Sequence, residues 1–149
     1  ENGVLFIDNT QVYLAPEIRA NTELLKKAAL YLQNLDSVKE VFVPALHEWN
    51  LMNSTIGEFV RNAYNSKNSG DILLHSFPGW MDQRDYGTTH GTAYTTDTHV
   101  PMLWYGWGVK QGLSIAPHTI TQIAPTLSML LDIPLPDASD RRPIGEIFE

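Results

Sequence analysis

The chain has 149 residues, 43% of them hydrophobic and 18% charged, which suits one folded domain or two small lobes and excludes a disordered composition. Its formal net charge of −7 argues against binding to nucleic acid or to anionic membranes, since both need clustered Lys and Arg. Cysteine is absent, which excludes disulfides and thiolate metal sites, and no apolar run reaches the roughly 18 residues of a membrane span.

The first part of the chain predicts a hairpin followed by a helix. Residues 4–7 and 12–14 are apolar runs joined by turn-forming residues, which is typical of two paired strands. Residues 21–34 carry apolar side chains at helical spacing, and Asn21 or Thr22 can serve as the N-cap.

A strand, a helix and another strand are predicted next. Residues 38–43 are rich in β-branched side chains and predict a strand. The segment TIGEFVRNAY has one apolar stripe at helical spacing, and Thr55 and Glu58 match a capping box. Residues 71–77 predict the last strand. We therefore expect a small α+β lobe of the ferredoxin-like sort, with its helices on one face of the sheet, that ends near Phe77.

The second half of the chain has a different pattern. Residues 102–105 form a short apolar run that predicts a strand, and residues 121–131 have the apolar spacing of a helix with Pro125 near its first turns. The Pro- and charge-rich tail PLPDASDRRPIGEIFE is predicted to run over the surface. Two parts are expected, residues 1–77 and residues 78–149.

Two histidines and an aspartate lie between these parts, in the loop THGTAYTTDTHV. His90 precedes Gly91, whose missing Cβ leaves room for close approach to the backbone. Asp97 is two residues before His99 and can orient a histidine through its second ring nitrogen. A catalytic zinc usually needs three protein ligands, so these residues alone make an incomplete site. The alternative interpretation is an ordinary surface turn with a hydrogen-bonded histidine.

The remaining histidines and the tryptophans have less specific patterns. His47, His75 and His118 have no polar cluster around them in the sequence, so they are predicted to be structural or exposed. The three tryptophans of the second half are expected to pack in the core or at strand ends, since large aromatic side chains usually contribute buried area. A binding platform is the alternative for these residues, which are Trp80, Trp104 and Trp107.

The block THGTAY…DTHVPMLWYGWG resembles the C-terminal part of the alkaline phosphatase superfamily. The similar branch is that of threonine-nucleophile phosphomonoesterases allied to type I phosphodiesterase/nucleotide pyrophosphatases. RNAYNSKNSGDILLHSFPGW and ITQIAPTLSMLLDIPLPDAS agree with it, so the resemblance covers about residues 61–147. It implies an α/β fold in which residues 1–77 are a ferredoxin-like insertion lobe. Residues 78–149 would then supply the last strands and helix of the catalytic sheet.

The resemblance also implies a chemistry. Enzymes of this family use two zinc ions and a threonine that becomes a phosphothreonine. His90 matches one zinc ligand, whereas Asp97 and His99 match positions that shape the loop or lie behind the ligands. No catalytic residue is expected within this chain. The threonines that match no nucleophile motif are Thr55, Thr92, Thr95 and Thr96.

We therefore expect the C-terminal fragment of a zinc-dependent phosphatase for small phosphate monoesters. Alone it should be inactive and metal-free or weakly metal-binding, because the nucleophile and most ligands belong to a missing N-terminal part. Two alternatives remain: a phosphodiester, phosphonate or sulfate ester hydrolase of the same superfamily, and a non-catalytic module that binds through the tryptophans. The resemblance implies a periplasmic or secreted enzyme.

Overall fold

A computed structural model describes residues 3–8, 10–46, 54–81, 86–87 and 90–148 of the chain. Their contacts divide the chain into two compact units, Glu1–Val100 and Pro101–Glu149. The boundary expected near residue 77 concerns the catalytic domain of a longer enzyme and stays a prediction. Within this chain, the described residues between 78 and 100 belong to the first unit.

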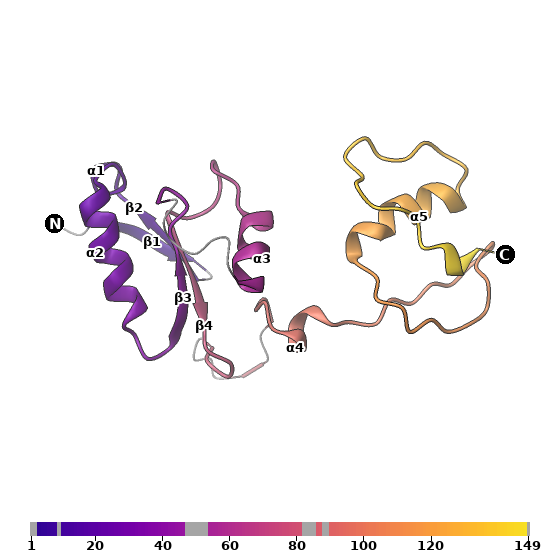
Figure 1. The fold of residues 1–149 in the computed structure, drawn as a ribbon, viewed down its shortest axis with the longest axis horizontal. Helices are drawn as coiled ribbons and strands as arrows, with labels where there is room; N and C mark the ends of the chain where they lie inside the picture. Colours follow the sequence, from indigo (N-terminus) through magenta and orange to yellow (C-terminus); the bar gives the residue numbers. More distant parts are fainter. Residues whose placement is uncertain (1–2, 9, 47–53, 82–85, 88–89, 149) are drawn as a thin grey trace. The chain divides into compact units, whose positions relative to one another are not determined.

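The first unit is built on a four-stranded sheet in the order β1-β2-β4-β3 (Figure 1). The predicted hairpin is present, with β1 (Val4–Asp8) antiparallel to β2 (Gln11–Leu14). β4 (Ile72–Ser76) pairs antiparallel with both β2 and β3 (Val38–Phe42). β2 and β3 therefore run parallel on either side of β4, which is the split βαβ arrangement of ferredoxin-like lobes.

α2 (Thr22–Gln33) lies against one face of this sheet (Figure 1). The Asn21 side chain accepts the first free N–H groups of the helix, so the prediction of an N-cap at Asn21 or Thr22 is confirmed for Asn21. Leu25 and Ala29, four residues apart, are both buried because they share the face turned to the sheet. The strand and loop residues of this core are Val12, Leu14, Val38, Val41, Val43, Leu46 and Ile72.

A short helix that the sequence analysis did not predict, α1 (Pro16–Arg19), connects the hairpin to α2. Pro16 follows the hairpin and begins this helix. A proline suits the first helical position, because the N–H that it lacks would have no partner there.

α3 (Thr55–Ala63) confirms the predicted second helix but corrects its cap. The Ser54 hydroxyl accepts the Gly57 N–H at 2.9 Å and donates to the Glu40 carboxylate at 2.9 Å. Thr55 is therefore the first helical residue and not the cap, because the contact with Glu40 on β3 selects Ser54.

The helices of the first unit lie on both faces of the sheet, which corrects the expectation of a single covered face (Figure 1). Neighbouring strand residues point to opposite faces, and Val41 points into the core under α2. Glu40, which holds the start of α3, therefore points to the other face. His75 lies directly opposite Glu40 in the β3–β4 ladder and shares that second face.

The second unit contains α5 (Ile123–Leu130), which confirms the helix predicted over residues 121–131. A 3₁₀ turn, η1 (Ile120–Gln122), leads into it, and a second one, η2 (Gly145–Ile147), lies in the tail. The Thr126 hydroxyl, fully buried, donates to the Gln122 carbonyl at 2.6 Å and accepts the Ile144 N–H at 2.9 Å. The tail is thus not wholly at the surface, since Ile144 is buried.

The strand predicted over residues 102–105 is not formed in the second unit. Leu103 is 91% exposed, as is expected of an apolar segment without a neighbouring strand to pair with. The prediction of a strand here is therefore wrong, and the described part of this unit offers no strand as a partner. None of the helices in the described ranges has the length and apolar character required to cross a membrane.

Candidate functional site

The candidate site is the loop of residues 90–99, hereafter the histidine loop, which belongs to the first unit. A single helical turn, α4 (Thr95–Thr98), closes this loop. His90 and His99 are exposed and Asp97 is partly buried. The three residues singled out from the sequence therefore lie at two ends and one inner position of a short structured loop.

Asp97 joins two inner positions of the histidine loop. Its Oδ2 atom accepts the Thr92 backbone N–H at 2.8 Å and the Thr92 hydroxyl at 2.7 Å. These bonds hold the pKa of the Asp97 carboxyl below its ordinary value, with the hydroxyl the largest cause, and the Gly91 N–H and the His90 imidazole act in the same direction. The predicted loop-shaping role of Asp97 thus has a geometric basis in Thr92.

Gly91 contributes conformation and not space. Its φ of 111° is one that residues with a side chain rarely adopt, and a Cβ built on it would meet nothing within 4 Å. The left-handed turn at Gly91 separates His90 from the segment that Asp97 stabilises. His90 is therefore presented beside a fixed turn, and its role as a metal ligand stays a prediction.

His99 ends α4 and has a structural contact of its own. Its backbone N–H donates to the Thr95 carbonyl at 3.0 Å, while its side chain is exposed. Nothing in this geometry directs the His99 ring toward His90, so its role behind the ligands is also still a prediction.

Tyr94 anchors the histidine loop to the sheet, and the sequence analysis missed it. Its hydroxyl donates to the Ser76 carbonyl at 2.9 Å, and its ring lies 4.8 Å from the His75 ring, tilted by 58°. The Lys39 ammonium lies 5.3 Å from the centre of the same ring, a cation–π distance. An aromatic residue among small polar ones, in TAYTTDT, is the signal that could have identified this anchor.

His75 is buried under Tyr94, as the structural interpretation of this histidine predicted. Only 8% of it is exposed, and neither ring nitrogen has a hydrogen-bond partner among the described residues. Burial lowers the pKa of His75, a shift that Glu40 opposes and Lys39 increases. The neutral imidazole therefore suits this site. His47 lies outside the described residues, and His118 is partly buried with its Nε2 atom 3.4 Å from the Glu146 carboxylate.

The histidine loop fits a metal only as a contributor. The imidazole is a common ligand of Zn²⁺, and the imidazole of His90 is exposed. Across the part of the chain that the structure describes, no three His, Cys, Asp or Glu side chains come together as a metal site. The residues present therefore fit one ligand of a shared site and do not make a complete one.

The tryptophans are more exposed than core packing predicted. Trp80, in the first unit, is 53% exposed, and Trp107, in the second, is 92% exposed, whereas Trp104 is partly buried. The expectation of burial is therefore wrong for Trp80 and Trp107. Trp107 follows the segment 102–105, which has no pairing strand among the described residues, and its ring is exposed as well. That single rings are exposed does not show that the three tryptophans form one binding surface.

Comparison with known proteins places this geometry in context. The chain is 36% identical to the alkaline phosphatase PafA of Elizabethkingia meningoseptica, over 99% of the chain and 28% of that protein. It is 36% identical to a calcium-transporting ATPase of Myroides odoratus, over 95% of the chain and 27% of that protein. The alkaline phosphatase PhoV of Synechococcus elongatus is 36% identical over 59% of the chain. No family model matches the chain.

The fold is also similar to a solved structure. The crystal structure of wild-type alkaline phosphatase PafA matches the whole chain with a TM-score of 0.86 and 33% sequence identity. The match covers 30% of that phosphatase. The two relatives that match nearly the whole chain are also much longer, and the chain spans less than a third of the length of each.

Proposed function

We propose that this chain, a member of the alkaline phosphatase superfamily by its sequence and fold, forms part of a zinc-dependent phosphatase that hydrolyses small phosphate monoesters. Its similarity to two proteins named alkaline phosphatases, at 36% identity each, supports the reaction class. The phosphate ester substrates, the metal and the threonine nucleophile belong to the proposal.

The observation that carries the proposal is the fixed presentation of His90. The histidine loop is attached to β4 by Tyr94 and closed on itself by Asp97, which limits where the neighbouring imidazole can lie. Precise positioning is what a ligand of a catalytic metal requires. Bound there, zinc would supply Lewis-acid stabilisation of the charge on a phosphate ester.

The division of labour within the longer enzyme follows from the residues present. His90 contributes one metal ligand. The threonine that would form a phosphothreonine comes from a part of the enzyme that corresponds to the unmatched portion of the relatives. In-line displacement at phosphorus needs the nucleophile and the metals placed together. We therefore expect this chain alone to be inactive toward p-nitrophenyl phosphate with added zinc. Turnover that His90→Ala abolishes would contradict that expectation.

A chimera tests the reaction class. This chain would replace the matching segment of the alkaline phosphatase PafA, with which it shares 36% identity. The chimera is expected to hydrolyse p-nitrophenyl phosphate faster than a phosphodiester or a sulfate ester of the same phenol. Because one relative carries the name of a calcium-transporting ATPase, ATP would be tested beside them. A preference for the diester or the sulfate ester would contradict the proposal.

We extend the proposal to location. Phosphate esters that cannot enter a cell are hydrolysed outside it, and the family resemblance implies a periplasmic or secreted enzyme. Cell fractionation with an antibody to this segment would test it, and enrichment in the cytoplasmic fraction would contradict it.

A further inference from the structure

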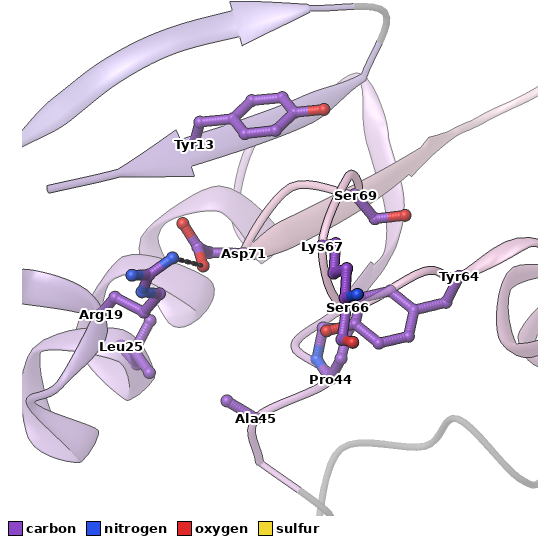
Figure 2. A pocket seen from close by; sticks show the side chains of 10 residues that line it. All are labelled: Tyr13, Arg19, Leu25, Pro44, Ala45, Tyr64, Ser66, Lys67, Ser69 and Asp71. Carbon is purple, nitrogen blue, oxygen red and sulfur yellow. Dashed lines mark ion pairs between the residues drawn. The ribbon is translucent and has the colours of Figure 1, made fainter. Parts of the chain in front are cut away.

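A cavity of about 500 Å³ lies in the first unit, between α1, α2 and the loop that follows α3 (Figure 2). Its volume falls in the range of small-molecule sites, roughly 300–1,000 Å³. Arg19 and Asp71 lie on one side of the cavity and residues 64–69 on the other. None of the residues that line it belongs to the histidine loop, so the cavity is separate from the candidate site described above.

The loop of residues 64–69 forms a rigid wall. The Asn65 carbonyl accepts the N–H groups of Asn68 and Ser69 at 3.1 and 2.8 Å, and the Asn65 side chain accepts the Lys67 N–H at 3.0 Å. The Tyr13 hydroxyl, from β2, donates to the Asn68 carbonyl at 3.0 Å and ties the loop to the sheet. A wall that is already ordered loses little conformational entropy when a ligand binds.

The cavity is rich in hydrogen-bond donors that have no acceptor among the described residues. The Lys67 ammonium and the Ser66 hydroxyl have no described partner. The Ser69 oxygen accepts the Asn65 N–H at 3.0 Å, which leaves its own hydroxyl hydrogen to donate.

The carboxylate of the cavity does not satisfy these donors. Asp71 accepts the Leu14 N–H at 2.8 Å, and it lies 3.9 Å from Arg19, a distance at which the guanidinium keeps donors for another acceptor. The lining thus contains two cations, Arg19 and Lys67, and one carboxylate, whose Oδ2 atom already accepts a hydrogen bond, in a chain whose net charge is −7.

We propose that this cavity binds a small organic phosphate. A phosphate group offers three terminal oxygens, which match the ammonium, guanidinium and hydroxyl donors better than the two oxygens of a carboxylate. The rest of the lining is apolar or aromatic and suits a flat ring. The side chains that would contact such a ring are Tyr13, Leu25, Pro44, Ala45 and Tyr64.

Phenylphosphonate is the probe for this site, because its carbon–phosphorus bond resists hydrolysis. It would be titrated into the ¹⁵N-labelled chain, followed by backbone amide NMR, with inorganic phosphate titrated in parallel. We expect saturable shifts at the amides of Ser66, Lys67 and Ser69, with phenylphosphonate binding more tightly than phosphate. Lys67→Ala should weaken binding about tenfold, the effect of one charged hydrogen bond. Arg19→Gln should do the same.

Lys27→Ala is the matched control, because it removes one exposed charge from α2 outside the cavity. Equal affinity in Lys67→Ala and Lys27→Ala, or no saturable shift at the loop, would overturn the proposal. Phosphate binding as tightly as phenylphosphonate would overturn the organic part of it. Lys67 is exposed, so its variant keeps the test valid even if Arg19→Gln disturbs Asp71. The NMR titration measures binding and no turnover. If the cavity does not bind phenylphosphonate, the phosphatase proposal is unaffected, and if the phosphatase proposal fails, the titration still tests the cavity.

Discussion

The Tyr94 hydroxyl donates to the Ser76 carbonyl at 2.9 Å, which joins the histidine loop to the end of β4. The same ring lies on the buried His75 ring, so one side chain supplies both a polar and a packing contact. The loop that presents His90 is thereby part of the sheet's second face. It is not an independent surface turn.

Tyr94→Phe tests the polar half of this anchor. The variant keeps the ring on His75 but loses the bond to Ser76, so the free energy of unfolding should fall by about 1 kcal/mol. Tyr94→Ala, which removes the ring too, should cost more. Urea unfolding monitored by circular dichroism would measure both. Tyr31→Phe is the control, because Tyr31 is exposed on α2. If Tyr31→Phe lowered the free energy of unfolding as much as Tyr94→Phe does, the role of Tyr94 as an anchor would be contradicted.

His75 makes the first unit less stable at acid pH. Burial lowers its pKa from the ordinary 6.5, so the unfolded chain takes up a proton more readily than the folded one. The resulting loss of stability is absent when the pH is well above the pKa that His75 has in the unfolded chain. It grows as the pH falls from there toward the folded pKa. His75→Phe should reduce the difference in urea midpoint between about pH 8 and about pH 5.

The control for that measurement is His99→Gln, since the His99 side chain is exposed and the His75 side chain is buried. It should leave the pH dependence as it is in the unaltered chain. An unchanged pH dependence in His75→Phe would mean that the buried ring accepts a proton without loss, and would contradict the prediction.

Asp97→Asn should loosen the histidine loop. The charged carboxylate accepts two bonds from Thr92, and its pKa is lowered because those bonds favour the ionised form. Their contribution is present above the unfolded pKa of about 3.8 and is lost as the pH falls through the folded value. The Thr92 amide should exchange with solvent faster in the variant. Asp137→Asn, in the second unit, serves as the control, and equal Thr92 exchange in both variants would rule out this role.

Thr126→Val tests the second unit. The variant leaves the buried Ile144 N–H and the Gln122 carbonyl without the hydroxyl that joins them, which should cost about 1–3 kcal/mol. Thr121→Val removes an exposed hydroxyl that water can replace, so it should cost much less. Unfolding of the two variants by urea gives the comparison. Similar stabilities would show that the tail is not held by Thr126.

The local elements of this fold could be predicted because their signals lie within a few residues of each other. Asn21 caps α2 through its immediate neighbours, and the helix around Ile123 has its own apolar spacing. Ser54 rather than Thr55 caps α3 because of Glu40, a contact across 14 residues that the local pattern does not contain. The strand expected over residues 102–105 failed for a similar reason, since its own apolar pattern does not show whether another strand lies beside it.

In the candidate site, too, the residue types could be predicted from the sequence and the contacts between distant residues could not. His90, Asp97 and His99 were found from the types and spacing of their side chains, and Thr92 as the partner of Asp97 was not. Tyr94 was missed because its role depends on Ser76 and His75, which lie on a strand that packs against the loop only in the folded chain.

The most direct test of the account is the zinc content of the PafA chimera, measured by atomic emission beside its hydrolysis of p-nitrophenyl phosphate. His90→Ala is expected to lose bound zinc and most of the activity, whereas His99→Ala keeps its zinc. A His90→Ala chimera with the zinc content and turnover of the unaltered chimera would contradict the assignment of His90 as a ligand.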